Sequence, residues 1–457
     1  MAVGIDTALK FGCAAATEES SLDAAARAAD RCLGALGGVA PDLAFLFFSG
    51  HHASMSGAVA ELVQKRLGPR VMVGTSAEAV LGGRAELEGV PGISILAGVL
   101  PGVELKAFSA DDFEVPDGSD EGLSKLSGAM GISDELRSVV LFADPFSAPM
   151  SRVLPAMSRL AREAGVAAGA AGKQLRAPVV MGGMASAGKA PGENRLVLNG
   201  RTMTGGLVGV TLSGAVRVDC VVSQGCRAFG PAFVITKARG NIIFELGGRP
   251  ALRVLQEAVA ELSEEQRAKL PGGPFIGRVI NEYKERFGRS DYLIRTVMGF
   301  DPNTGAVAVG DLVRVGQTIR FHARDAQTAS EDLALLLDAQ KLYDKPAGAL
   351  LVTCNGRGSR LFEHKGHDIN AVAGAFERPR AGEDLAKGGA AVRVAELGSG
   401  SLPVAGFFAQ GEIGPVGDES FLHGQTACVA LFRRVEHARE RRQEPTASEP
   451  APPGPRA

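Results

Sequence analysis

The chain has 457 residues, enough for two or three domains of ordinary size and for a large buried core. Its 49 Lys and Arg residues nearly balance its 51 Asp and Glu residues, which disfavours nucleic acid and anionic membranes as partners. Six cysteines without a CxxC pair fit reduced thiols, so we expect neither disulfides nor structural zinc. No secretion signal and no run of about 20 apolar residues is present, and these absences predict a soluble, cytoplasmic protein.

In chain order, the first clear element is a helix over residues 20–38, with Ser20 and Asp23 in the pattern of a capping box. Its expected buried stripe consists of Leu22, Ala26, Ala29, Leu33 and Leu36. The segment "DLAFLFFSG" follows as a buried strand, "SGAVAELVQKRLGP" as a second helix and "RVMVGTSAE" as another strand. This order predicts a right-handed crossover between parallel strands.

The same order of elements recurs three times. An apolar strand, a glycine-rich polar turn, a loop and a second apolar strand begin at residues 71, 179 and 403. Each copy is preceded by a strand and a helical stretch, and the preceding strands are "AFLFFSG", "SVVLFADPFS" and "ALLVTCNGRG". We therefore expect recurring strand-helix-strand units, with Ser49, Asp144 and Cys354 at comparable places in them.

Between the second and third copies, residues 232–236 and 241–246 are predicted to form a hairpin, and the best domain break lies near residue 235. Farther on, strands around the turn "DPNTG" precede a helix that Thr328 and Glu331 are expected to cap. The fold class is α/β to α+β with mixed sheets in two packed halves, residues 10–235 and 236–432. A helical stub and a disordered tail are expected over residues 433–457, where proline is frequent and apolar residues are rare.

Five segments in order carry a resemblance to a known family: "PDLAFLFFSGHH", "VMVGTSAEAVLGG", "GDLVRVGQTIRFHARDAQTASEDL", "CNGRG" and "GFFAQGEIGPVGDESFLHGQTACVALF". Together they resemble the FIST (F-box and intracellular signal transduction) sensory proteins, over residues 10 to 432. The resemblance implies a FIST N-terminal domain to about residue 235, a FIST C-terminal domain after it, and a sensory module that binds small ligands such as amino acids. It implies no catalytic triad, cofactor or metal. Many relatives are fused to output domains or an F-box, and from this sequence we expect neither.

Two motifs have simpler explanations. The segment "GMASAGKA" matches a phosphate loop, but Ala190 replaces the Ser or Thr that binds Mg²⁺, and Pro191 with Gly192 prevents a following helix. His364 and His367 lack the further ligands that a metal site needs, so a solvated loop is the better interpretation.

The candidate ligand residues lie at strand ends, where open α/β sheets place their pockets. In "CNGRG", two glycines would let backbone amides and the planar guanidinium of Arg357 approach a carboxylate. The alternative is a tight turn with an exposed arginine. The turn "QGEIGP" supplies Glu412 as an anion, and a plain salt bridge is its alternative. The full set of candidates is Ser49, His51, Thr75, Ser76, Glu78, Cys354, Asn355, Arg357, Gln410, Glu412 and His423.

Three functions remain open. The first is a small-ligand sensor for amino acids or small carboxylates, with Arg357 holding a carboxylate and Glu412 an amine or hydroxyl, and with a signalling protein as a possible partner. The second is a hydrolase or transferase with Cys354 as nucleophile, His423 as base and Glu412 as orienting group. The third is a protein-interaction scaffold without ligand. The resemblance favours the sensor, which would not be an enzyme.

Overall fold

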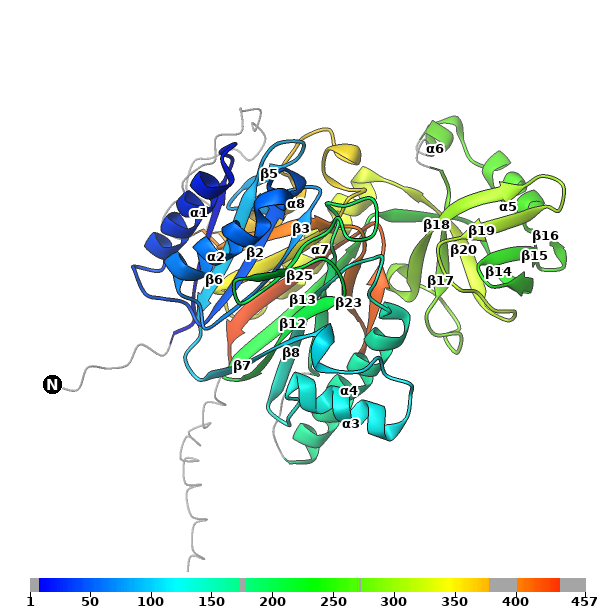
Figure 1. The fold of residues 1–457 in the computed structure, drawn as a ribbon. Coiled ribbons are helices and arrows are strands. Elements are labelled where there is room, and N and C mark those ends of the chain that lie inside the picture. The colour runs from blue at the N-terminus through cyan, green and yellow to red at the C-terminus, as the bar shows by residue number, and fades with distance from the viewer. Residues whose placement is uncertain (1–7, 172–176, 269, 271–272, 378–400, 436–457) are drawn as a thin grey trace, which may run out of the picture.

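The computed structural model describes residues 8–171, 177–268, 270, 273–377 and 401–435. Three six-stranded mixed sheets form the main body, and a fourth, antiparallel sheet forms a separate lobe at its side (Figure 1). The predicted α/β to α+β class with mixed sheets is confirmed. Within the described ranges, no helix is long and apolar enough to cross a membrane.

The three sheets of the body have the same strand order. Sheet 1 contains, in order, β1 (Lys10–Ala16), β6 (Ile93–Val99), β2 (Leu43–Ser49), β3 (Val71–Ala77), β10 (Leu196–Leu198) and β11 (Arg201–Met203). Sheet 2 contains β7 (Val103–Ser109), β12 (Leu207–Gly214), β8 (Leu136–Ala143), β9 (Val179–Met184), β23 (Glu412–Val416) and β24 (Glu419–His423). Sheet 3 contains β13 (Val216–Gln224), β25 (Thr426–Arg434), β21 (Gly348–Cys354), β22 (Val404–Ala409), β4 (Val80–Gly82) and β5 (Ala85–Leu87).

In each of these three sheets the third and fourth strands are parallel, and the other neighbours are antiparallel. The predicted parallel crossover and the three recurring units are therefore confirmed. We call them unit 1 (residues 10–99), unit 2 (103–214) and unit 3 (216–224 and 326–434). Each unit donates its short hairpin to another unit's sheet: β4 and β5 join sheet 3, β10 and β11 join sheet 1, and β23 and β24 join sheet 2. This cyclic exchange interlocks the units.

Each parallel pair of strands contains one glycine at the same position, and these glycines show which residues of the three units are equivalent. A Cβ added at Gly74 would lie 1.9 Å from the carbonyl oxygen of Leu46 on the neighbouring strand. The corresponding distances are 1.8 Å from Gly182 to Leu141 and 1.7 Å from Gly406 to Leu351. No side chain fits at such distances, so the backbones approach closely only because these positions are glycine. Three residues after each leucine stand Ser49, Asp144 and Cys354, whose predicted equivalence is confirmed.

Helices cover the outer face of each sheet, and phenylalanines fill the space between the sheets. The pairs are α1 (Ser21–Ala35) with α2 (Ser56–Leu67) on sheet 1, α3 (Asp120–Met130) with α4 (Met150–Ala170) on sheet 2, and α7 (Ala326–Gln340) with α8 (His367–Ala375) on sheet 3 (Figure 1). Inside, the rings of Phe47, Phe142 and Phe407, one from each sheet, lie 4.9 to 5.5 Å apart between centroids. Their mutual contact joins the units into one core.

Two helix predictions need correction. Ser20 caps α1 as expected, and Ala29 and Leu36 of the predicted stripe are buried. Leu22 is exposed instead, and the rest of the buried face consists of Ala24, Ala25, Ala28 and Cys32. Small side chains let this helix lie close to its sheet, which a stripe of large apolar residues does not reveal. Helix α7 begins earlier than predicted, because the carboxylate of Asp325 accepts from the Gln327 amide and is the N-cap in place of Thr328.

The separate lobe is an antiparallel barrel inserted into unit 3 between β13 and α7. Its strands are, in order, β14 (Cys226–Arg239), β20 (Thr318–Arg324), β17 (Phe275–Val279), β18 (Tyr292–Asp301), β19 (Ala306–Val309) and β15 (Ile242–Leu246), and β14 pairs with β15 to close the ladder. The lobe also contains β16 (Arg249–Pro250), α5 (Ala251–Ala260), α6 (Glu264–Ala268) and η3 (Arg289–Asp291). The short helices η1 (Gly50–Met55), η2 (Ala110–Asp112) and η4 (Gly358–Arg360) belong to the main body.

The predicted hairpin around residues 232–246 is confirmed as part of β14 and β15. The domain break predicted near residue 235 falls inside β14, where no structural unit ends. Sheet 3 also combines strands from both sides of that position. Of the predicted terminal stub, Arg433 and Arg434 belong to β25, and residues 436–457 lie outside the described residues.

Candidate functional site

The carboxyl ends of the parallel strands of all three units meet around Ser186. Its hydroxyl accepts from the Glu78 amide at 2.9 Å and donates to the carbonyl oxygen of Phe408. The Ser186 amide donates to the Ser76 carbonyl at 3.3 Å, and the Gln410 amide donates to the Met184 carbonyl at 3.2 Å. The turns that follow β3 and β22 are therefore neighbours, and unit 2 supplies the hydroxyl that links them.

A cleft of about 230 Å³ opens beside this junction, between unit 1 and unit 3. It is lined by Glu78, Ala79, Glu88, Gly89, Asn355, Ser359, Arg360, Lys365 and Phe408. Two acidic and two basic side chains face this cleft. A site with that volume and polarity matches a small polar metabolite better than a large apolar ligand.

The charges in the cleft are unevenly paired. The guanidinium of Arg360 forms an exposed ion pair with the Glu78 carboxylate. The carboxylate of Glu88 accepts from the Ser359 amide at 3.0 Å and from its hydroxyl at 2.7 Å. Lys365 has no carboxylate partner among the described residues; its ammonium donates only to the Glu88 carbonyl oxygen, at 3.4 Å. Lys365 is therefore a cation available to an incoming anion.

Behind the cleft, Arg357 is fully buried, which corrects the expectation of an exposed rim arginine. Its Nε and Nη2 donate to the two carboxylate oxygens of Asp368 at 2.7 and 2.8 Å, and its guanidinium lies over the ring of Phe362. The guanidinium that was expected to bind a ligand carboxylate is therefore already paired with the carboxylate of Asp368. That carboxylate next to the guanidinium has a pKa held well below the usual range despite its burial.

Glu412 and Cys354 are buried next to each other beside Arg357. One oxygen of the Glu412 carboxylate accepts from the hydroxyl and the amide of Thr426, at 2.7 and 3.1 Å. Burial raises the pKa of Glu412 to about 8, although these hydrogen bonds oppose the change. Burial and the nearby Glu412 carboxyl also raise the pKa of the Cys354 thiol far above its usual value, so the thiolate is strongly disfavoured.

Unpaired buried polar atoms concentrate at this end of sheet 3 and in the adjoining β23–β24 hairpin of sheet 2. Among the described residues, eleven buried side-chain nitrogen or oxygen atoms lack a hydrogen-bond partner within the protein. Five of the eleven belong to Asn355, Arg357, Glu412, His423 and Gln425. Because nearly all buried polar groups in native proteins are hydrogen-bonded, such a concentration marks a polar site rather than an ordinary core. Asn355 connects it to the cleft, since it also lines the cleft.

The remaining predicted site residues have mainly structural contacts. Thr75 and Ser76 are buried, and the hydroxyl of Ser76 accepts from the Arg195 amide at 2.8 Å. The hydroxyl of Ser49 accepts from the Gly92 amide at 3.0 Å and contacts Nδ1 of the exposed His51 at 3.2 Å. These four candidates hold loops in place and do not line the cleft.

His423 and Gln410 complete the predicted set. His423 is buried opposite Glu412 in the hairpin of β23 and β24, and its Nε2 contacts the Gly414 carbonyl oxygen at 2.9 Å. Burial lowers the pKa of this imidazole to about 4. Among the contacts of the described residues, none joins His423 to Cys354. Gln410 is exposed at the junction of the three units.

Five residues of the site were not predicted from the sequence: Glu88, Ser359, Arg360, Lys365 and Asp368. Glu88 comes from unit 1 and lies more than 270 positions before Ser359, a separation that no local pattern spans. Asp368 stands in the first turn of α8, and an acidic residue there also has a local explanation in the helix dipole.

The phosphate-loop match is explained by its surroundings. Gly183 belongs to β9, and the chain then runs through a loop to β10, without the helix whose amides would face a phosphate. Lys189 and Ala190 donate their amides to the Glu193 carboxylate instead. Within the part of the chain that the structure describes, no group of three or more His, Cys, Asp or Glu side chains is arranged to hold a metal ion.

Comparisons with known proteins cover nearly the whole chain. A model of the FIST N domain matches residues 42–249, and a model of the FIST C domain matches residues 251–415. The "Uncharacterized protein Rv0628c" of Mycobacterium tuberculosis is 34% identical over 426 residues, which are 93% of this chain and 100% of the relative. The "Uncharacterized protein Mb0898c" of Mycobacterium bovis is 34% identical over 427 residues, 93% of this chain and 99% of the relative.

Among solved structures, a cyanuric acid hydrolase from A. caulinodans aligns with 47% of this chain and 72% of that chain. The sequence identity is 12% and the TM-score is 0.23. This likeness is too weak to support a conclusion about function.

Proposed function

Because the chain belongs to the FIST family, whose domains are generally taken as small-ligand sensory domains of signal transduction, we propose that it senses a small zwitterionic or carboxylate metabolite, plausibly an amino acid. The ligand binds in the cleft between units 1 and 3. Lys365 holds the ligand carboxylate, and Glu78 and Glu88 supply negative charge for its amine. The observation that carries the proposal is the Lys365 ammonium, which has no carboxylate partner among the described residues and lies in a small polar cleft that two carboxylates also line.

Charge balance in the cleft supports a zwitterion. Two acidic side chains, Glu78 and Glu88, face two basic ones, Arg360 and Lys365, so the lining carries no net charge at neutral pH. A ligand with one charge of each sign can pair with both signs of the lining. A dianion would meet the two carboxylates, and repulsion between like charges disfavours it.

In this proposal Lys365 and Arg360 bind the ligand carboxylate, in place of Arg357 that the sequence suggested. Both oxygens of Asp368 occupy the Arg357 fork, and displacing them would leave a buried carboxylate without its partner. Arg360 is exposed and its partner Glu78 is exposed too, so exchanging this pair for a ligand carboxylate costs little.

The proposed activity is binding without turnover. A nucleophilic cysteine needs a stabilised thiolate and a base within hydrogen-bond reach. Cys354 is buried beside Glu412, which raises the pKa of its thiol, and His423 is held by the Gly414 carbonyl oxygen. These contacts favour a structural role for both residues.

Calorimetric titration and thermal unfolding with a panel of amino acids test the proposal. Ligand at 100 times its dissociation constant is expected to stabilise the protein by about 2.7 kcal/mol. The carboxamide and the N-acetyl derivative of a bound amino acid should each bind at least about tenfold more weakly, since each removes one charge from the ligand.

Lys365→Met should weaken binding of the intact amino acid to about the level of its carboxamide while the unliganded protein keeps its stability. Lys237→Met is the matched control, because it removes an exposed lysine from the barrel, far along the chain from the cleft. If no amino acid or small acid binds at millimolar concentration, the sensor assignment is wrong and the scaffold interpretation takes its place.

A further inference from the structure

The barrel reaches the proposed ligand cleft through one arginine. Arg324 is the last residue of β20, and its guanidinium donates to the carbonyl oxygen of Gly356 at 2.9 Å and to that of Arg360 at 3.2 Å. Both acceptors lie on the loop of unit 3 that carries Asn355, Ser359 and Arg360 into the cleft. A single barrel side chain therefore holds the loop at two points.

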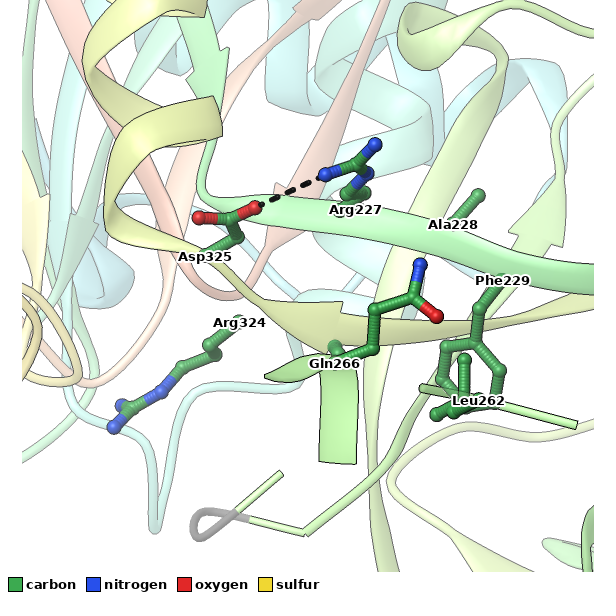
Figure 2. A pocket seen from close by; sticks show the side chains of 8 residues that line it. Arg227, Ala228, Phe229, Leu262, Gln266, Arg324 and Asp325 are labelled. Atoms are coloured by element: carbon green, nitrogen blue, oxygen red, sulfur yellow. Dashed lines mark ion pairs between the residues drawn. The ribbon is translucent and has the colours of Figure 1, made fainter. Parts of the chain in front are cut away.

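Figure 2 shows how Arg324 differs from its neighbours at the mouth of the small barrel pocket. Phe229, Leu262 and Gln266 lie together on one side, and Arg227 pairs with Asp325 at 3.8 Å. The Arg324 side chain extends away from Phe229 and Leu262. Its two hydrogen bonds are made to the loop of unit 3 and not to barrel groups.

The covalent connections of the barrel reach the same end of sheet 3. The Gly225 amide, just before β14, donates to the Gln425 carbonyl at 2.9 Å, and the Asp325 amide, just after β20, donates to the Gly225 carbonyl at 3.2 Å. A Cβ at Gly225 would lie 3.0 Å from Nη1 of the buried Arg357. The backbone at which the barrel joins the body therefore lies against Arg357, behind the cleft.

We propose that Arg324 is a positioning residue for the ligand cleft, supplied by the barrel, and that ligand binding and barrel attachment are coupled through it. The binding consequence rests on the proposed function. If Arg324 holds the loop in its binding-competent form, its loss lowers the population of that form, and the apparent affinity falls by the same fraction. By linkage, a ligand that orders the loop strengthens the barrel contact by an equal factor.

The test compares Arg324→Met, which keeps the aliphatic stem and removes every donor, with Arg227→Met as the control. Arg227 is exposed and also belongs to the barrel mouth, but it contacts Asp325 and not the loop. Without ligand, hydrogen exchange of the amides of Arg357, Arg360 and Leu361 should become several-fold faster in Arg324→Met and stay unchanged in Arg227→Met. With an amino acid that binds the wild-type protein, Arg324→Met should weaken binding about tenfold. Arg324→Lys should recover part of the loss, because its ammonium can still donate although it lacks the planar fork of the guanidinium.

In the wild-type protein the ligand should also slow exchange at the ends of β14 and β20, and this protection should vanish in Arg324→Met. Unchanged loop exchange in Arg324→Met overturns the positioning role, whether or not a ligand is known. Faster loop exchange with unchanged affinity overturns the coupling. If no amino acid binds the wild-type protein, the proposed function fails, while the exchange of the loop amides still decides the role of Arg324.

Discussion

The guanidinium of Arg357 and the carboxylate of Asp368 form a two-point ion pair with no solvent exposure, at nitrogen to oxygen distances of 2.7 and 2.8 Å. Arg357 ends the turn after β21 and Asp368 lies in the first turn of α8, so the ion pair connects the helix to the end of the strand. It also fixes the loop between them, which contains Ser359, Arg360 and Lys365 of the cleft.

Removing one member of this pair should destabilise the protein strongly, because the other charge stays buried without its partner. We expect Asp368→Ala to lower the free energy of unfolding by about 3–5 kcal/mol. Arg360→Met, which breaks an exposed ion pair, should change it by less than about 1 kcal/mol. Denaturant titrations of both variants measure the difference, and equal effects would show that burial does not set the energy of the Arg357 pair.

The carboxyl group of Glu412 should make stability depend on pH. Its pKa in the folded protein is about 8 and the ordinary value is 4.5, so the folded protein keeps this proton over an interval in which the unfolded chain has released it. The free energy of unfolding should therefore fall as pH rises from about 4.5 to 8, by at most about 1.4 kcal/mol per pH unit.

The measurement for Glu412 compares wild type with Glu412→Gln from pH 5 to 8. The variant should gain stability relative to wild type as pH rises, since it carries no charge to bury. Glu86 and His423 titrate in both proteins and their contributions cancel in the comparison. A difference that is constant with pH would mean that Glu412 is already ionised in the folded protein.

The buried thiol of Cys354 should be unreactive in the folded protein. Its fully desolvated position beside Glu412 disfavours the thiolate, which is the form that attacks iodoacetamide. We expect slow labelling at pH 8, and labelling of all six cysteines once denaturant is added. A rapid, stoichiometric modification of Cys354 in the native protein would revive the hydrolase interpretation.

The close approach of Gly406 to Leu351 predicts a severe effect for one added methyl group. In Gly406→Ala the new Cβ would lie 1.7 Å from a backbone carbonyl oxygen, so two paired strands must move apart. The loss should exceed about 3 kcal/mol. Gly34→Ala is the control, because its Cβ meets nothing within 4 Å in α1 and should stabilise by about 0.5–1 kcal/mol.

Truncating Phe142 should lower the stability of the protein strongly, because its side chain lies where the three sheets share one core. Its ring contacts those of Phe47 and Phe407, which come from the other two sheets. Phe142→Ala is expected to lower the free energy of unfolding by about 3–5 kcal/mol. Phe300→Ala, at a barrel position with 61% of its surface exposed, should change it by no more than about 0.5 kcal/mol.

The sequence by itself determined the three repeated units, because each depends on local signals. Apolar runs such as residues 43–49 predict buried strands, and the alternation of strand and helix predicts the parallel pairs. The equivalence of Ser49, Asp144 and Cys354 followed from the same repetition. The sequence also indicated the end of sheet 3 as the site, since polar residues follow β21 and β22 there.

Only the tertiary structure decided which of those polar residues face the cleft. A glycine-rich turn predicts an exposed Arg357, but the side chain is buried in an ion pair with Asp368 of the following helix. An ion pair between separate elements has no signal in the local sequence. Hairpin exchange brings Glu88 of unit 1 onto Ser359 of unit 3, which sequence spacing cannot reveal. Burial and partner choice depend on how distant segments pack, and those contacts determined the chemistry of the site.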